Sequence, residues 1–194
     1  FYSSHVGGTK KLPHRLQNLQ FFEQQLFEQL LFPFLKESSK KTKPKYLSFD
    51  HLAERANTRF ECLNHINTAE GLEVLKFSEP DLILSIRFGK ILKEEAIAIP
   101  KLGILNLHSG LLPQYQGVMA TFWAMLNEES NYGTTLHFID SPAIDAGPVV
   151  TRTESPLDLG KSYLQNVLEL YKPGVESISQ AVLQLSEGTL LSTT

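Results

Sequence analysis

The spacing of apolar residues divides the chain into helical and extended segments. Over residues 15–35, apolar side chains recur every three or four positions, which predicts a helix with a buried face. That stripe consists of Leu19, Phe22, Leu26, Leu30 and Phe34. Pro33 is expected to end or kink the helix, because proline lacks the N–H group that the interior of an α-helix needs.

Nearly unbroken apolar runs at residues 81–86 and 103–108 predict two buried strands of the kind found in parallel sheets. A short helix over residues 93–98 would supply the crossover between them. The pattern predicts further elements, helices over 120–128 and 161–185, the latter divided or kinked at Pro173, and strands over 134–139 and from residue 149. This alternation of strands and helices predicts a doubly wound α/β sheet.

Shorter patterns predict smaller elements before residue 80. Residues 46–49 are expected to form a short strand, and residues 50–57 a short helix. The spacing of Asn67 and Glu70 matches a capping box, which predicts a helix from there to about Phe77.

Composition then limits the class of protein. The chain has 194 residues, 42% of them hydrophobic and 20% charged, which is ordinary for one globular domain, and its net charge of -3 gives no basic field to attract nucleic acid. Cys62 is the single cysteine, which excludes an internal disulfide, and we interpret it as a small buried residue. No apolar run is long enough to span a membrane, so we expect a cytoplasmic protein. Because the chain does not open with methionine, we also expect a β/α unit to be missing before Phe1.

Candidate chemistry begins at the end of the strand predicted over 103–108. Asn106 and His108 are two residues apart, so their side chains project to the same side of that strand. An amide donor beside an imidazole can hold a developing oxyanion and move a proton. The alternative is that His108 is a hydrogen-bonded core histidine and Asn106 a strand-end cap.

Further motifs follow this pair in a fixed order. They are Leu-Leu-Pro-Gln-Tyr-Gln-Gly at 111–117, His-Phe-Ile-Asp at 137–140 and Asp-Ala-Gly-Pro at 145–148. Between about residues 81 and 151 this arrangement resembles the folate-dependent formyltransferases. That family includes glycinamide ribonucleotide transformylase, methionyl-tRNA formyltransferase, nucleotide-sugar N-formyltransferases and formyltetrahydrofolate hydrolase.

The resemblance implies a Rossmann-like, doubly wound, mostly parallel sheet with helices on both faces, and a single catalytic domain over residues 1–194. It implies 10-formyltetrahydrofolate as co-substrate, no metal, and Asn106, His108 and Asp145 as catalytic residues. Without His108, Asp145 would be read as part of a plain turn. In the family the pterin is held largely through backbone groups, here those of Phe88, Gly89, Lys90, Ile91, Leu92, Asp140, Ser141, Pro142, Ala143 and Ile144. The Leu112–Pro113 peptide bond is expected to be cis.

The resemblance leaves the acceptor open. Residues 122–124 and 137–140 are more similar to the sugar-modifying branch, so our leading hypothesis is N-formylation of a small-molecule amine such as a nucleotide-linked amino sugar. Gln116 stands where an arginine is common, which weakens the case for methionyl-tRNA, and Ser109-Gly110 replaces the usual Pro-Ser. The alternatives are a formyltetrahydrofolate hydrolase, a glycinamide ribonucleotide or methionyl-tRNA formyltransferase, and a non-catalytic folate-binding domain.

Overall fold

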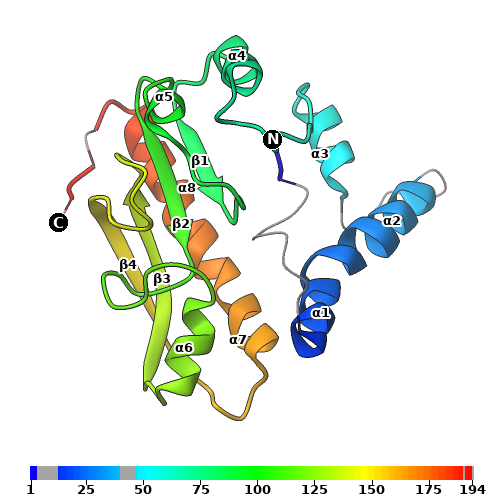
Figure 1. Cartoon of the computed structure of the whole chain (residues 1–194), viewed down its shortest axis with the longest axis vertical. Coiled ribbons are helices and arrows are strands. Elements are labelled where there is room, and N and C mark those ends of the chain that lie inside the picture. The colour runs from blue at the N-terminus through cyan, green and yellow to red at the C-terminus, as the bar shows by residue number, and fades with distance from the viewer. Residues whose placement is uncertain (4–12, 40–46, 190, 194) are drawn as a thin grey trace. The chain divides into compact units, whose positions relative to one another are not determined.

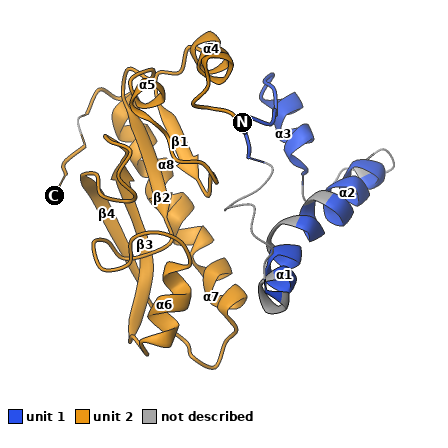
Figure 2. Ribbon diagram, in the orientation of Figure 1, with its two compact units in different colours: residues 1–64 blue, residues 65–194 orange. Residues whose placement is uncertain are grey.

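The computed structural model describes residues 1–3, 13–39, 47–189 and 191–193. These residues form two compact units, Phe1–Asn64 and His65–Thr194, which we call unit 1 and unit 2 (Figure 2). The expectation of one catalytic domain over residues 1–194 stays a prediction.

Unit 1 contains a continuous helical run from residue 14 to residue 39. It comprises α1 (His14–Gln20), a π-helical segment η1 (Phe21–Leu31) and α2 (Phe32–Ser39) (Figure 1). The helix predicted over 15–35 is therefore confirmed. Pro33 does not end this helix. Its missing N–H group falls near the junction of η1 and α2, where the backbone N–H groups change from bonding the carbonyl five residues earlier to bonding the carbonyl four residues earlier.

The apolar stripe of this helix is not buried as predicted. Phe22 is 49% exposed, Leu30 55% and Phe34 68%. The prediction is wrong for these side chains because helical periodicity shows which residues share a face, but not what covers that face.

The helix predicted over 50–57 is confirmed as α3 (Phe49–Arg55). The strand predicted over 46–49 is wrong for residues 47–49, and residue 46 lies outside the described residues. Ser48 is the N-cap of α3, and its hydroxyl accepts the N–H of His51. This cap satisfies a helix-end donor and so favours a helix after Ser48.

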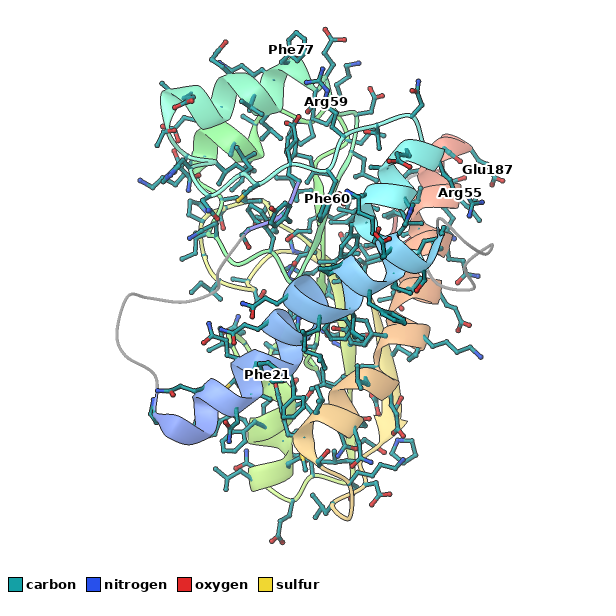
Figure 3. The ribbon with its side chains drawn as sticks, turned by 90° about the vertical axis from the view of Figure 1, so that its right-hand side faces the viewer. Phe21, Arg55, Arg59, Phe60, Phe77 and Glu187 are labelled. Carbon is teal, nitrogen blue, oxygen red and sulfur yellow. The ribbon has the colours of Figure 1, made fainter. Side chains whose placement is uncertain are left out.

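Cys62 is exposed, so its interpretation as a buried residue is wrong. Its backbone forms an isolated parallel bridge with Tyr2, which holds the chain without burying the thiol. Around it the packing is aromatic. Phe60, labelled in Figure 3, stacks on Tyr2 at 4.6 Å and on Phe49 at 4.7 Å between ring centroids.

Unit 2 is built on a four-stranded sheet in the order β1 (Ile83–Ile86), β2 (Ile104–His108), β3 (Asn131–Phe138) and β4 (Val149–Pro156). Its helices are α4 (Ala69–Phe77), α5 (Glu94–Ile97), α6 (Ala120–Leu126), α7 (Tyr163–Glu169) and α8 (Tyr171–Ser186). The predicted α/β, Rossmann-like class is confirmed. The last predicted helix is divided at Leu170 and not at Pro173, which lies in the first turn of α8. In the part of the chain that the structure describes, no helix is long and apolar enough to cross a membrane.

The directions of the strands differ from the prediction. β1 and β2 run parallel and are joined through α5, as expected. β3 runs antiparallel to β2, and β4 antiparallel to β3, so the sheet is mixed rather than mostly parallel. Burial on both faces makes a strand look like a member of a parallel sheet whatever the direction of its neighbours.

The main core of unit 2 lies between the sheet and α8, which runs along one face (Figure 1). This cluster consists of Leu105, Leu136, Ile178 and Ala181, with Leu107 packed against it. Alternate residues of a strand face opposite sides. The odd-numbered residues of β2 therefore face α8, and Asn106 and His108 face the other side.

β1 is an edge strand of the described sheet and is less buried than predicted. Leu84 and Ile86 are 43% and 44% exposed, and Ser85 is the buried residue of the strand. An apolar run indicates that a strand can be buried, but it does not show where the strand lies in the sheet. Because β1 is at the edge, it has one neighbouring strand and is partly exposed.

The helix predicted to end near Phe77 is confirmed as α4, but its cap is not the predicted one. Thr68 is the N-cap, and its hydroxyl accepts the N–H of Gly71. Asn67 precedes this cap, so its side chain is not used by α4. Phe77, labelled in Figure 3, ends the helix and is 87% exposed.

Replacing Leu136 by alanine should lower the free energy of unfolding by about 2–5 kcal/mol, because the change leaves a cavity in the core against α8. The matched control is Leu183→Ala on α8, since Leu183 is 61% exposed and its loss should cost about 0.5 kcal/mol or less. Chemical denaturation measures both variants. Equal effects would contradict this placement of the core.

Candidate active site

Two neighbouring strands present polar side chains on the face that points away from α8. Asn106 and His108 come from β2, and His137 on β3 lies opposite Asn106 in the strand register. His108 is 8% exposed and His137 is 1% exposed. Buried imidazoles need hydrogen-bond partners, so the contacts of these rings define the site.

Asp145 reaches this face from the loop between β3 and β4. Asn106 Nδ2 donates to Asp145 Oδ1 at 3.2 Å, and His108 Nδ1 lies 3.4 Å from Asp145 Oδ2. The structure thus brings the predicted catalytic residues together. They do not meet at the carboxyl ends of neighbouring strands, as a parallel sheet would require. Because β3 is antiparallel to β2, the loop starts beside the amino end of β2, where Ile139 N–H donates to Ile104 O, and it folds back.

The backbone of Asp145 has φ of 49°, a left-handed conformation that is uncommon for a residue with a Cβ atom. Two contacts from the segment before α6 hold it there. The Gly117 N–H donates to Asp145 Oδ2 at 2.9 Å, and Gln116 Nε2 donates to the Asp145 carbonyl oxygen at 3.0 Å. Gln116, read from the sequence only as a departure from a motif, therefore supports the candidate catalytic carboxylate.

The segment between β2 and α6 is itself tied to the sheet. Its Leu112–Pro113 peptide bond is cis, as predicted. The Leu112 N–H donates to Thr135 Oγ1 at 3.1 Å, and Arg152 Nε donates to the Leu112 carbonyl oxygen at 2.8 Å. His108 Nε2 donates to the Tyr115 carbonyl oxygen at 2.7 Å. These bonds from three strands fix the segment that in turn holds the carboxylate.

His137 also belongs to this cluster, a position that the sequence does not predict. Its Nδ1 lies 2.9 Å from the Phe138 carbonyl oxygen, and its Nε2 lies 3.0 Å from Asn106 Nδ2. We assign the ring proton to Nδ1, which leaves Nε2 to accept from the amide. The opposite amide orientation would place its oxygen against Asp145 Oδ1. The motif at 137–140 was the available signal, but the pairing of His137 with Asn106 depends on a strand register that the sequence does not show.

The environment of Asp145 favours its charged form. Burial alone would raise the pKa of this carboxyl. Contact with the His137 ring, the charge of a protonated His108 and the Gly117 N–H together outweigh burial and hold the pKa of Asp145 below its usual value. The His137 ring lies 3.4 Å from Oδ1 and the Asn106 amide 3.2 Å, so we take the amide as the nearer donor.

The residues predicted to hold a pterin lie in two irregular segments. Residues 88–92 follow β1, and residues 140–144 lie in the loop between β3 and β4. Ile91 and Ile144 are each 56% exposed, whereas Leu92 is 5% exposed. That the two segments border one pocket stays a prediction.

A cavity of about 550 Å³ lies elsewhere, lined by residues of β4, α8 and the C-terminal stretch. None of the predicted site residues lines it, so it is separate from the cluster around Asp145. Within the described ranges, no group of three or more His, Cys, Asp or Glu side chains is arranged to hold a metal ion.

The sequence of this chain is similar to those of known proteins. The model of a family described as "Formyl transferase" matches residues 39–181. A methionyl-tRNA formyltransferase of Clostridioides difficile is 32% identical over 119 residues, which are 61% of this chain and 38% of that protein. The chain thus spans less than half the length of the curated relatives it matches.

Solved structures agree on the fold. Glycinamide ribonucleotide transformylase 1 from Symbiobacterium toebii superposes with a TM-score of 0.64 at 20% identity, covering 73% of this chain and 70% of that one. A sugar N-formyltransferase from Shewanella sp. gives a TM-score of 0.58 at 13% identity, covering 86% and 70% of the two chains.

The lowered pKa of Asp145 predicts how stability depends on pH. Its carboxylate stabilises the fold fully above the ordinary carboxyl pKa of about 3.9, and this contribution is lost as the pH falls through the lower pKa of the folded state. The variant Asp145→Asn has no carboxyl group at this position, so this contribution to its stability does not change with pH. The difference in free energy of unfolding between the wild type and Asp145→Asn should therefore shrink as the pH falls below about 4.

Urea denaturation of both proteins over a series of pH values measures this difference. A difference that stays constant, or grows toward acid pH, would contradict the lowered pKa. Asp81→Asn serves as the control, because the Asp81 side chain is 69% exposed and its pairing with Lys101 lies at the surface.

Proposed function

Because this chain belongs to the formyl transferase family, we propose that it moves the formyl group of 10-formyltetrahydrofolate to the amino group of a small molecule. The observation that carries the proposal is the contact of one carboxylate with both Asn106 and His108, at 3.2 and 3.4 Å. A strand-end cap and a core histidine would need no shared carboxylate. Since the chain spans less than half of its curated relatives, the activity of the whole protein is part of this proposal.

Formyl transfer requires an amine nitrogen to attack the formyl carbon, and negative charge then develops on the formyl oxygen. Asn106 supplies an N–H group for that oxygen. In the present arrangement its amide faces two protein acceptors, His137 Nε2 at 3.0 Å and Asp145 Oδ1 at 3.2 Å. The formyl oxygen must replace one of them. If the formyl oxygen replaces Asp145 Oδ1, which makes the longer of the two bonds, then Oδ1 also becomes available to accept a proton.

Asp145 and His108 provide the route for the proton that the attacking amine gives up. The lowered pKa of Asp145 keeps its carboxylate ionised at neutral pH, ready to accept a hydrogen bond from the amine. His108 Nδ1, 3.4 Å from Oδ2, can take that proton from the carboxylate, and the protonated ring can then release a proton toward the folate nitrogen. A bond forms between the formyl carbon and the amine, the bond to the folate nitrogen breaks, and the proton ends on that nitrogen. No covalent enzyme intermediate is needed.

We propose that the formyl donor binds against the two irregular segments at 88–92 and 140–144. Exposed Ile91 and Ile144 offer apolar surface to a flat ring. Irregular segments, unlike strands, do not commit their backbone groups to a ladder, so such groups can meet the polar edge of a pterin. We therefore retain both segments as the proposed donor site.

For the acceptor we propose an amino sugar that is linked to a nucleotide. The motifs at 122–124 and 137–140 and the neutral side chain of Gln116 support this choice. Methionyl-tRNA is the second candidate, favoured by sequence relatives that are methionyl-tRNA formyltransferases at 30–32% identity. Formylation assays with each acceptor separate the two. Formate release in the absence of any amine would instead favour a hydrolase.

Charge rather than shape should separate the catalytic interpretation from the structural one. Asp145→Asn keeps the size of the side chain but loses its charge, so turnover should fall by about a hundredfold or more at a temperature at which the variant is still folded. His108→Asn keeps a donor but loses the titrating ring, and it should also lower turnover. Formyl-transfer rates and melting temperatures of both variants provide the test.

If both residues only satisfy the backbone, the pattern reverses. Asp145→Asn would then be nearly silent in turnover, and His108→Asn would cost stability first, by about 1–3 kcal/mol for a buried group left unpaired. Asp81→Asn, at the surface, should leave turnover at the wild-type rate. Full activity in Asp145→Asn would end the proposed mechanism.

A further inference from the structure

The side chain of Asn67 bridges two parts of unit 2 that are distant in sequence. Its Nδ2 donates to the Ile91 carbonyl oxygen at 2.7 Å, and its Oδ1 accepts the N–H of Lys93 at 2.8 Å. Both ends of one amide are therefore engaged on either side of Leu92. α4 follows Asn67 and α5 follows Lys93, and these two helices lie side by side (Figure 1).

These two bonds act on a stretch that has no regular secondary structure. Residues 91–93 join no strand or helix, so their backbone groups need partners from elsewhere. Leu92 is buried and anchors the stretch through its side chain, whereas Ile91 is 56% exposed. The amide of Asn67 fixes the peptide groups on both sides of that anchor, and so fixes the direction in which Ile91 points.

We propose that Asn67 is a positioning residue for the formyl donor. It holds the backbone of the segment at 88–92 in the shape that receives the pterin. This inference rests on the proposed function, which assigns that segment to the donor. Recognition through backbone groups depends on their geometry before the ligand arrives, because any ordering that binding must impose weakens affinity.

The chemistry of the position requires an amide. Asn67→Ala removes both bonds. Asn67→Asp is nearly the same size and can still accept from Lys93 N–H, but it has no donor for the Ile91 carbonyl and sets a carboxylate against it. The alternative is that Asn67 only joins α4 to α5. That role would change thermal stability without a selective effect on the donor.

The experiment is calorimetric titration of the full chain with 5-formyltetrahydrofolate, a stable analogue of the donor, together with steady-state kinetics. Asn67→Ala should weaken binding of the analogue about tenfold, which corresponds to about 1.4 kcal/mol. Asn67→Asp should weaken it in the same direction. The donor KM should rise in parallel, with kcat at saturating donor within about twofold of the wild type, because the residues around Asp145 are untouched.

Asn131→Ala is the matched control, since Asn131 is exposed at the start of β3 and should leave donor binding unchanged. Variants that lose thermal stability but bind the analogue as the wild type does would overturn the inference and leave the proposed function standing. Failure of the wild-type chain to bind the analogue would overturn both. If Asn67→Ala does not fold, the near-isosteric Asn67→Asp decides by the same measurement.

Discussion

The site depends on the Asp145 carboxylate, a charged group that is largely removed from water. A buried charge is costly unless donors surround it. Here the groups around it come from different parts of the chain: the Asn106 amide and the His108 ring from β2, and the Gly117 N–H from the segment before α6. The contacts of this one carboxylate connect β2, the segment before α6 and the loop between β3 and β4. The left-handed backbone of Asp145 is tolerated because these contacts hold it.

The same contacts set a condition on the proposed formyl transfer. The donors that a formyl oxygen needs are already engaged with protein acceptors, His108 with the Tyr115 carbonyl oxygen and Asn106 with His137 and Asp145. Substrate must therefore exchange with a protein contact. The bond to Asp145 is the longest of these at 3.2 Å, and catalytic hydrogen bonds are often long before substrate binds. In the proposed mechanism, binding of the formyl group and release of the Asp145 carboxylate as a base are therefore one event.

Motifs in the sequence predicted most of the elements and pointed to Asn106, His108 and Asp145, which the structure brings together. The two-residue period placed Asn106 and His108 on one face, and the resemblance to the formyltransferases implied the cis bond before Pro113, which the structure confirms. Features that depend on contacts between elements distant in the sequence were predicted less well. The direction of β3, the exposure of Phe34 and the pairing of His137 with Asn106 are set by neighbours that a periodicity does not reveal. The catalytic roles themselves stay predictions.

A double-mutant cycle on formyl transfer tests the central claim, that His108 and Asp145 act as one unit. The rates of His108→Asn, Asp145→Asn and the double variant are compared with that of the wild type. Because the two side chains lie 3.4 Å apart and share one proton route, the double variant should be within about threefold of the slower single variant. A double variant slowed by the product of the two single effects would show that the residues act independently, and would contradict this account.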